Sequence, residues 1–220
     1  MKRVKIMMGA GCMMMATLVS WAVAADMTDI PLPTLRMIGG KPLMEALKER
    51  HSTRAFSTKT LPVQVVADLL WAGFGVNRPE SGKRTAPSAR NWQEVSVYAI
   101  FKEGAYRYDA AANRLSAVAT GDLRKLTGTQ GFVTTAPLNL VYVSDITRMQ
   151  GAAPEHRVLY SGADVGFISQ NVYLFCASEG LATVVRGSID RDALAKALNL
   201  PEHKQVILSQ TVGYPATEAR

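Results

Sequence analysis

The feature that most constrains the fold is a helical stretch of about 25 residues, Glu155 to Glu179, between two apolar extended segments. The segment before it, LNLVYVSD at 138–145, is a continuous apolar run typical of a strand covered on both faces. The segment after it, LATVVRG at 181–187, is rich in β-branched residues and ends at a glycine. A long helix inserted between two buried strands favours a domain built from a sheet and covering helices.

The remaining segments mix helical and extended patterns. Two segments with an apolar stripe, 42–51 and 61–75, predict helices, and a third helix is predicted at 188–200. A polar, turn-rich stretch at 77–91 predicts a long loop, and loops of this length are often functional. The other predicted elements are strands at 95–101 and 204–214, a hairpin at 105–119, and short helical pieces at 121–128 and 129–135. This mixture predicts an α+β fold.

Small residues inside the long helix need an explanation. Gly162, Ala163, Gly166 and Ser169 lie within it, and each interior glycine costs about 1 kcal/mol relative to alanine. Close approach of another helix or of a ligand would compensate for that cost.

The first 25 residues have the layout of a secretory signal peptide. Three basic residues near the start precede an apolar run at 6–19 and an A-x-A pattern at 22–24. We expect cleavage after Ala24 or Ala25, which leaves one domain at 26–220 and a periplasmic or secreted protein. An uncleaved membrane anchor is the alternative, but the run is short and broken by two glycines, which argues against a stable membrane span.

Charge and cysteine content exclude several classes of protein. Removal of the signal lowers the net charge from +7 to +4, too mild to predict binding to nucleic acid or to a membrane. Cys176 is then the only cysteine, so no internal disulfide is possible, and its apolar helical context predicts a buried, inert thiol. The three histidines and this cysteine have no metal-ligand spacing, and we predict no metal site.

Two polar motifs are suited to binding a ligand. ERHSTRAF, at 49–56, places Arg50, Ser52 and Arg54 at alternate positions, so that an extended segment would turn all three to one face. Arginine forks grip phosphate oxygens in a bidentate way. APSARNWQ, at 86–93, supplies amide and hydroxyl groups just before a strand. Each motif taken alone is also compatible with a solvated turn, and no nucleophile elbow, Walker loop or dinucleotide fingerprint accompanies them.

Taken together and in order, these motifs resemble the nitroreductase-like FMN flavoproteins, a family that includes azoline-oxidase-type dehydrogenases. RHSTRAF is similar to the opening R-x-S-x-[RK]-x-[FY] motif of the family, and PSARNWQ to its P-S-x-x-N-x-Q segment. The long helix with the strand after it, and VGYP near the end, extend the likeness from about Leu43 to Pro215.

The resemblance implies a three-layer α+β fold, with a mainly antiparallel central sheet flanked by helices, and an obligate homodimer with two FMN molecules at its interface. It implies ping-pong transfer of a hydride from NAD(P)H through FMN to a small organic acceptor, a nitroaromatic or quinone-like compound. No catalytic side chain is then expected, because the flavin carries the chemistry. The cofactor-binding residues that the resemblance implies are Arg50, His51, Ser52, Arg54, Pro87, Ser88, Asn91, Gln93, Arg186, Gly187 and Arg220.

The chain departs from the family pattern at three places. Arg186 stands where many relatives have an acidic or apolar residue; it either favours an anionic reduced flavin or an acidic substrate, or it points to solvent. Arg220 alone remains of the basic C-terminal residues that help to hold phosphate, so Arg50 and Arg54 would carry more of that role. The insertion that covers the active site in many relatives is absent between Leu115 and Thr135, which predicts an open cleft.

Two functions of different classes fit the sequence. The first is an exported FMN-dependent oxidoreductase. The second is an FMN- or ligand-binding module without turnover, which export keeps open because nicotinamide cofactors are scarce outside the cytoplasm.

Overall fold

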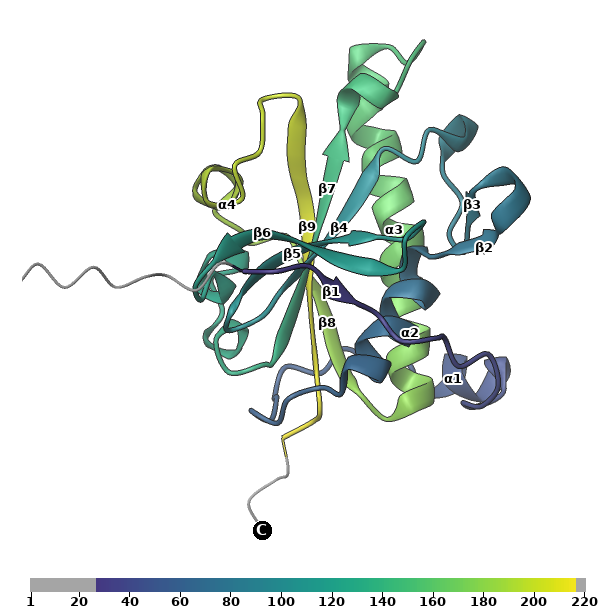
Figure 1. The fold of residues 1–220 in the computed structure, drawn as a ribbon, viewed down its shortest axis with the longest axis vertical. Coiled ribbons are helices and arrows are strands. Elements are labelled where there is room, and N and C mark those ends of the chain that lie inside the picture. Colours follow the sequence, from purple (N-terminus) through teal and green to yellow (C-terminus); the bar gives the residue numbers. More distant parts are fainter. Residues whose placement is uncertain (1–26, 217–220) are drawn as a thin grey trace, which may run out of the picture.

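The computed structural model describes residues 27–216 and contains a seven-stranded sheet in the order β1-β6-β5-β4-β7-β9-β8, in which every neighbouring pair is antiparallel (Figure 1). The strands are β1 (Ile30–Pro31), β4 (Val95–Ile100), β5 (Gly104–Asp109), β6 (Arg114–Thr120), β7 (Leu138–Asp145), β8 (Ala182–Arg186) and β9 (Lys204–Gly213). A separate hairpin consists of β2 (Val76–Arg78) and β3 (Lys83–Arg84). The predicted α+β class with a mainly antiparallel sheet is confirmed.

Four helices cover the sheet. They are α1 (Leu43–Glu49), α2 (Val63–Phe74), α3 (Pro154–Glu179) and α4 (Arg191–Ala197). The first three lie on one side of the sheet and α4 lies on the other, so the domain has three layers (Figure 1). Their ends follow local chemistry. Pro154 occupies the first turn of α3, Gly180 ends that helix with a φ of 67°, and the Asp190 carboxylate accepts the Ala193 N–H at the start of α4.

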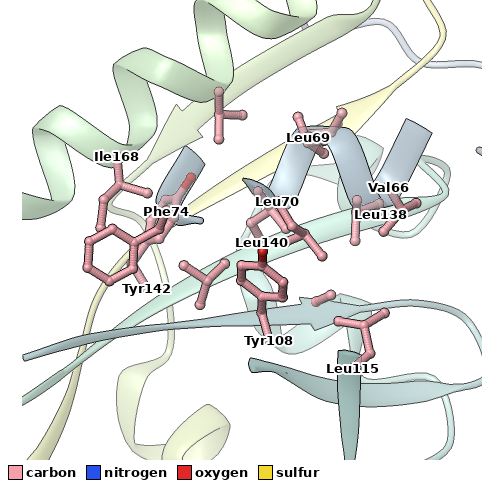
Figure 2. Close-up of a cluster of buried hydrophobic side chains, with 14 of the residues drawn as sticks. Val66, Leu69, Leu70, Phe74, Tyr108, Leu115, Leu138, Leu140, Tyr142 and Ile168 are labelled. Atoms are coloured by element: carbon pink, nitrogen blue, oxygen red, sulfur yellow. The ribbon is translucent and has the colours of Figure 1, made fainter. Parts of the chain in front are cut away.

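The central strand β7 is buried along both faces, as its apolar run predicted. Leu138, Leu140 and Tyr142 face α2 and α3, where they meet leucines and an isoleucine of those helices (Figure 2). Val141 and Val143 face the layer of α4. Each fully buried side chain of this size contributes about 1.5–3 kcal/mol, so β7 connects two cores and fixes the sheet between them.

Some short elements escaped the sequence analysis. The predicted loop at 77–91 contains the β2–β3 hairpin, and β1 adds a two-residue edge strand that pairs with β6. The pieces predicted as helical at 121–128 and 129–135 form 3-10 turns, Arg124–Thr127 and Gly131–Val133. Such elements are too short to show a hydrophobic period.

The remaining expectations concern the chain ends, membrane crossing and metal ions. The predicted signal peptide, residues 1–25, and Arg220 lie outside the described residues. Across residues 27–216, no helix combines the length and apolar character that crossing a membrane requires. The same residues contain no group of three or more histidine, cysteine, aspartate or glutamate side chains placed to hold a metal ion.

Candidate functional site

The ERHSTRAF segment runs in extended form past the end of the sheet. Arg50 ends α1, the Thr53 N–H donates to the Thr183 carbonyl of β8 at 3.0 Å, and Phe56 forms an isolated bridge with Pro215. These contacts tie the motif to β8 and to the chain that follows β9. Phe56 is buried against the Phe132 ring, with centroids 5.3 Å apart, and anchors the segment.

One tyrosine of α3 organises this motif. The Tyr173 hydroxyl accepts the Val185 N–H at 2.9 Å and lies 2.8 Å from the Ser52 hydroxyl. The Arg50 guanidinium carbon stacks 5.3 Å from the centre of the Tyr173 ring. Tyr173 therefore holds Arg50 and Ser52 beside the end of β8, on the side where Gly187 follows.

Two of the three alternating residues of this motif lie together. Arg50 and Ser52 do meet the same side chain, Tyr173, and Arg54 is exposed. The Nδ1 atom of His51 is 2.6 Å from the Glu49 carbonyl oxygen, and its ring is exposed. Neither Arg50 nor Arg54 forms an ion pair with another described residue. Two cations without a carboxylate partner fit the anion seat that the spacing suggested.

The PSARNWQ segment is a tight, strained loop. Arg90, Asn91 and Gln93 all have positive φ, between 47° and 56°, a region that costs a non-glycine residue about 1–2 kcal/mol. Hydrogen bonds within the loop hold this geometry: the Gln93 N–H donates to the Ser88 hydroxyl at 3.0 Å, and the Gln93 amide nitrogen donates to the Asn91 side-chain oxygen at 3.1 Å. Arg84, which the sequence analysis overlooked, adds a bond from its Nε to the Gln93 side-chain oxygen at 2.9 Å.

The loop is anchored on α3, but far from the first motif. The Ala89 N–H donates to the Asp164 carboxylate at 3.0 Å, and the Trp92 ring meets the Tyr160 ring edge-on at 5.6 Å. Asp164 and Tyr173 are nine residues apart on the helix, which is about 14 Å at 1.5 Å per residue. The structure thus attaches both motifs to one helix without bringing them together. Pro87 and Asn91 are exposed at the tip of this loop.

Arg186, at the end of β8, is buried, so its predicted alternative of pointing to solvent is wrong. Its Nη2 donates to the Asn139 side-chain oxygen of β7 at 3.0 Å, and its guanidinium carbon lies 5.5 Å from the centre of the Phe132 ring. Its Nε and Nη1 have no hydrogen-bond partner among the described residues. Burial lowers the pKa of Arg186 to about 10, which still leaves it charged at neutral pH. A cation held inside the protein without a counter-ion is costly and is characteristic of a site that meets an anion.

Gly187 leaves the sheet next to Arg186 and is exposed. A Cβ at this position would meet only the Leu208 side chain, at an ordinary contact distance of 3.7 Å, so the backbone here is not crowded by other side chains. No acceptor for the Gly187 N–H occurs within residues 27–216. An open glycine with a free N–H, next to a buried cation, fits a flat polar ring placed against the backbone. The predicted flavin therefore passes this geometric test.

Comparisons with known proteins identify the family. The family model described as "Nitroreductase family" matches residues 47–214, which is most of the chain. The chain belongs to the nitroreductase family. A curated protein of Methanocaldococcus jannaschii, described as a candidate nitroreductase, is 26% identical over 193 residues, covering 83% of this chain and 96% of that protein. As a member of the family, the chain is an oxidoreductase enzyme that depends on a flavin.

Solved structures of nitroreductases share the fold. The crystal structure of a candidate nitroreductase from Ralstonia eutropha JMP134 is 43% identical, with a TM-score of 0.84, and the match covers 90% of this chain and 94% of that one. The NADPH:FMN oxidoreductase of Vibrio harveyi in complex with NAD⁺ is 22% identical, with a TM-score of 0.58, covering 80% and 69% of the two chains. At that identity the second match supports the fold alone.

The residues that position the motifs carry no signal in the sequence. Tyr173 and Asp164 lie inside the long helix, and Asn139 lies inside an apolar strand, where nothing local marks a polar side chain as important. Glu94, directly after the second motif, is likewise not marked as important by any feature of the neighbouring sequence. Only the three-dimensional contacts identify these residues.

Proposed function

We propose that this nitroreductase binds FMN and transfers a hydride from NAD(P)H, or from another donor, to a small organic acceptor of nitroaromatic or quinone-like type. The observation that carries the proposal is the Tyr173 cluster. It holds Arg50 and Ser52 beside the open Gly187 backbone, so a phosphate seat and a ring seat occur at one end of β8. Family membership supports the same conclusion.

The residues of this chain would divide the work of holding the cofactor. Arg50 and Arg54 would bind the phosphate with charge-assisted hydrogen bonds, and Ser52 would add a neutral one. The Gly187 N–H would donate to the edge of the ring, fixing the ring relative to β8. FMN, when bound, supplies the hydride chemistry, which explains why no acid–base pair of side chains is needed.

Arg186 would set the charge preference of the site. Its guanidinium is buried directly before Gly187, and no described carboxylate pairs with it. A fixed cation favours negative charge nearby, whether on an acidic substrate or on the reduced cofactor.

We also propose a homodimer that completes the site. Asn91 and its loop are attached to α3 about 14 Å from Tyr173, too far for both to contact the same end of a cofactor in one chain. The exposed face of α3 carries apolar and small residues, namely Val158, Leu159, Gly162, Ala163, Gly166 and Phe167. A two-fold axis across this face would cover it and bring the loop of the partner to the first motif.

The proposal includes export of the protein from the cytoplasm. We infer periplasmic or secreted localisation from the N-terminal signal pattern, and N-terminal sequencing of the mature protein would locate the cut after Ala24 or Ala25. Export keeps one alternative open, an FMN-binding module without turnover, since the usual donor is scarce outside the cytoplasm.

The absorption spectrum of the purified protein tests the central claim. We expect a yellow protein that releases FMN on denaturation, and rapid bleaching when it is mixed anaerobically with NADPH or NADH. Bleaching only by an artificial donor or a quinol would favour a different electron source. A flavoprotein that no donor reduces would favour the binding module. A colourless protein that does not take up added FMN would refute both.

Variants of the phosphate seat sharpen this test. Arg50→Ala and Arg54→Ala should each weaken FMN binding about ten- to a hundredfold, because a hydrogen bond to a charged group contributes about 1.5–3 kcal/mol. Arg107→Ala, on an exposed position of β5, is the matched control and should leave the affinity unchanged. Wild-type affinity in both motif variants would remove these arginines from the site.

A further inference from the structure

Two buried carboxyl groups lie beneath the PSARNWQ loop, and the proposed chemistry does not use them. Glu94 follows the loop directly and is 0% exposed; Asp164 projects from α3 and is 2% exposed. Asp164 accepts the Ala89 N–H of the loop at 3.0 Å, whereas both carboxyl oxygens of Glu94 lack an N–H or hydroxyl donor from any other described residue. Two adjacent carboxylates cannot both be ionised in such a site without a large cost.

A single shared proton resolves this conflict. The Asp164 carboxylate raises the pKa of Glu94, which indicates that the two buried carboxyl groups lie close enough to share one proton. Asp164 already accepts a backbone N–H and is the better anion, so Glu94 carries the proton and donates it to Asp164. Asp164 then links the loop to the helix through two hydrogen bonds, one from Ala89 and one from Glu94.

We propose that Glu94 and Asp164 are positioning residues whose shared proton fastens the 87–93 loop to α3 in its strained, FMN-binding conformation. The proposal rests on the proposed function for its link to FMN, while the shared proton itself rests on the structure alone. The loop needs such a fastening, because Arg90, Asn91 and Gln93 are all held at positive φ just before Glu94.

Neighbouring groups set the pH at which Glu94 loses its proton and the loop loses this link to α3. Burial is the main cause that raises the pKa of Glu94, to about 7 from an ordinary value of 4.5, and the Asp164 carboxylate of α3 raises it further. The backbone N–H of Glu94 itself acts in the opposite direction, and so, to a smaller extent, does the exposed Arg148 in the 3-10 turn after β7. Burial also raises the pKa of Asp164, and the hydrogen bonds from Ala89 and Glu94 oppose that rise.

Deprotonation of Glu94 determines the direction of the pH dependence. In the folded protein Glu94 keeps a proton that the unfolded chain releases above about pH 4.5. Its stabilising effect is therefore complete below that pH and is lost as the pH rises through about 7. If the loop and FMN are fully coupled, FMN affinity falls by up to about tenfold for each pH unit above 7.

The test compares wild type with Glu94→Gln and Asp164→Asn between about pH 5.5 and about pH 8.5. An amide at either position supplies a permanent N–H donor to the remaining carboxylate; Glu94→Gln removes the titrating group, and Asp164→Asn removes the neighbouring charge. Thermal unfolding of FMN-free protein and the dissociation constant of FMN are measured on the same samples. Glu202→Gln, which changes an exposed carboxylate, is the control and should follow wild type.

We expect both wild-type profiles to fall through about pH 7, Glu94→Gln to be flat, and Asp164→Asn to move the fall to lower pH, because Glu94 stays buried there but no longer faces a carboxylate. A wild-type slope of unfolding that survives in both variants would overturn the shared proton. Variants that flatten unfolding but leave the pH dependence of FMN binding intact would overturn the positioning role. Absence of FMN binding in every protein at every pH would refute the proposed function and the positioning role, while the FMN-free unfolding profile would still decide whether the proton is shared. Should Glu94→Gln not fold, Asp164→Asn alone decides.

Discussion

Removing one oxygen atom from α3 should loosen the whole first motif. Tyr173→Phe keeps the ring under the Arg50 guanidinium and deletes only the hydroxyl, which accepts the Val185 N–H at 2.9 Å and contacts the Ser52 hydroxyl at 2.8 Å. Ser52 is exposed, so water can replace its lost partner. Val185 belongs to β8 and is only partly accessible, so its N–H is left poorly satisfied.

The expected cost is set by that orphaned N–H. Leaving a buried donor without a partner costs about 1–3 kcal/mol, and the partial exposure of Val185 favours the lower part of that range. We therefore expect the free energy of unfolding in urea to fall by about 1–2 kcal/mol. FMN affinity should fall as well, because the same hydroxyl joins the phosphate seat to the strand that ends at Gly187.

Tyr108→Phe provides a matched control. The Tyr108 hydroxyl is buried in the core and has no hydrogen-bond partner among the described residues, and burial raises its pKa to about 12 (Figure 2). Deleting an unsatisfied hydroxyl should be neutral or stabilising. If Tyr173→Phe costs no more than Tyr108→Phe, the reasoning that places Tyr173 at the centre of the site is refuted.

Three further predictions follow from buried arginines and from Gly187. Arg186→Met should raise the melting temperature of the FMN-free protein, since it removes an uncompensated buried cation while Asn139 keeps its bond from the Thr211 hydroxyl at 2.6 Å; a lower melting temperature would contradict this. Arg124→Met should instead cost about 1–3 kcal/mol in urea unfolding, because Arg124 pairs with Asp122 through bonds of 2.8 and 2.7 Å; a neutral result would refute the contrast. Gly187→Ala should leave stability within about 0.5 kcal/mol of wild type but weaken FMN binding, as measured by titration, and unchanged affinity would exclude a ring against this backbone.

The fold was predictable because its signals are local and strong. The apolar run of β7, the turn residues of the β5–β6 hairpin and the length of α3 each determine an element without outside information. The covered faces of β7 then required layers on both sides of the sheet. Two elements escaped prediction: β1, whose pairing with β6 depends on residues distant in sequence, and the β2–β3 hairpin, whose strands are too short to show a hydrophobic period.

The site was predictable only as a list of residues. Ordered motifs pointed to Arg50 and Ser52, but not to Tyr173, which holds them together. Arg186 shows the limit most clearly. Its place at the end of a strand was predicted correctly, whereas its burial depends on Asn139 and Phe132, which are distant in sequence. Burial and partnership are properties of the tertiary structure, and no periodicity encodes them.

The glycines of α3 allow a decisive test of the homodimer. A Cβ at Gly162 or Gly166 meets no atom within 4 Å in the single chain, so nothing inside the protomer requires a glycine there. A Gly166→Leu substitution should then stabilise the isolated protomer by up to about 1 kcal/mol through helix propensity. In a dimer packed across this face, the same side chain would block close approach of the partner helix.

We therefore expect Gly166→Leu to convert a dimer into a well-folded monomer with weakened FMN binding, as measured by analytical ultracentrifugation and flavin titration. Lys196→Leu, on the exposed face of α4, adds a leucine elsewhere and should leave the dimer intact. A wild-type monomer at micromolar concentration, or a Gly166→Leu dimer of unchanged stability, would exclude α3 as the interface. The small residues that make this helix intrinsically weaker would then have no compensation in the structure.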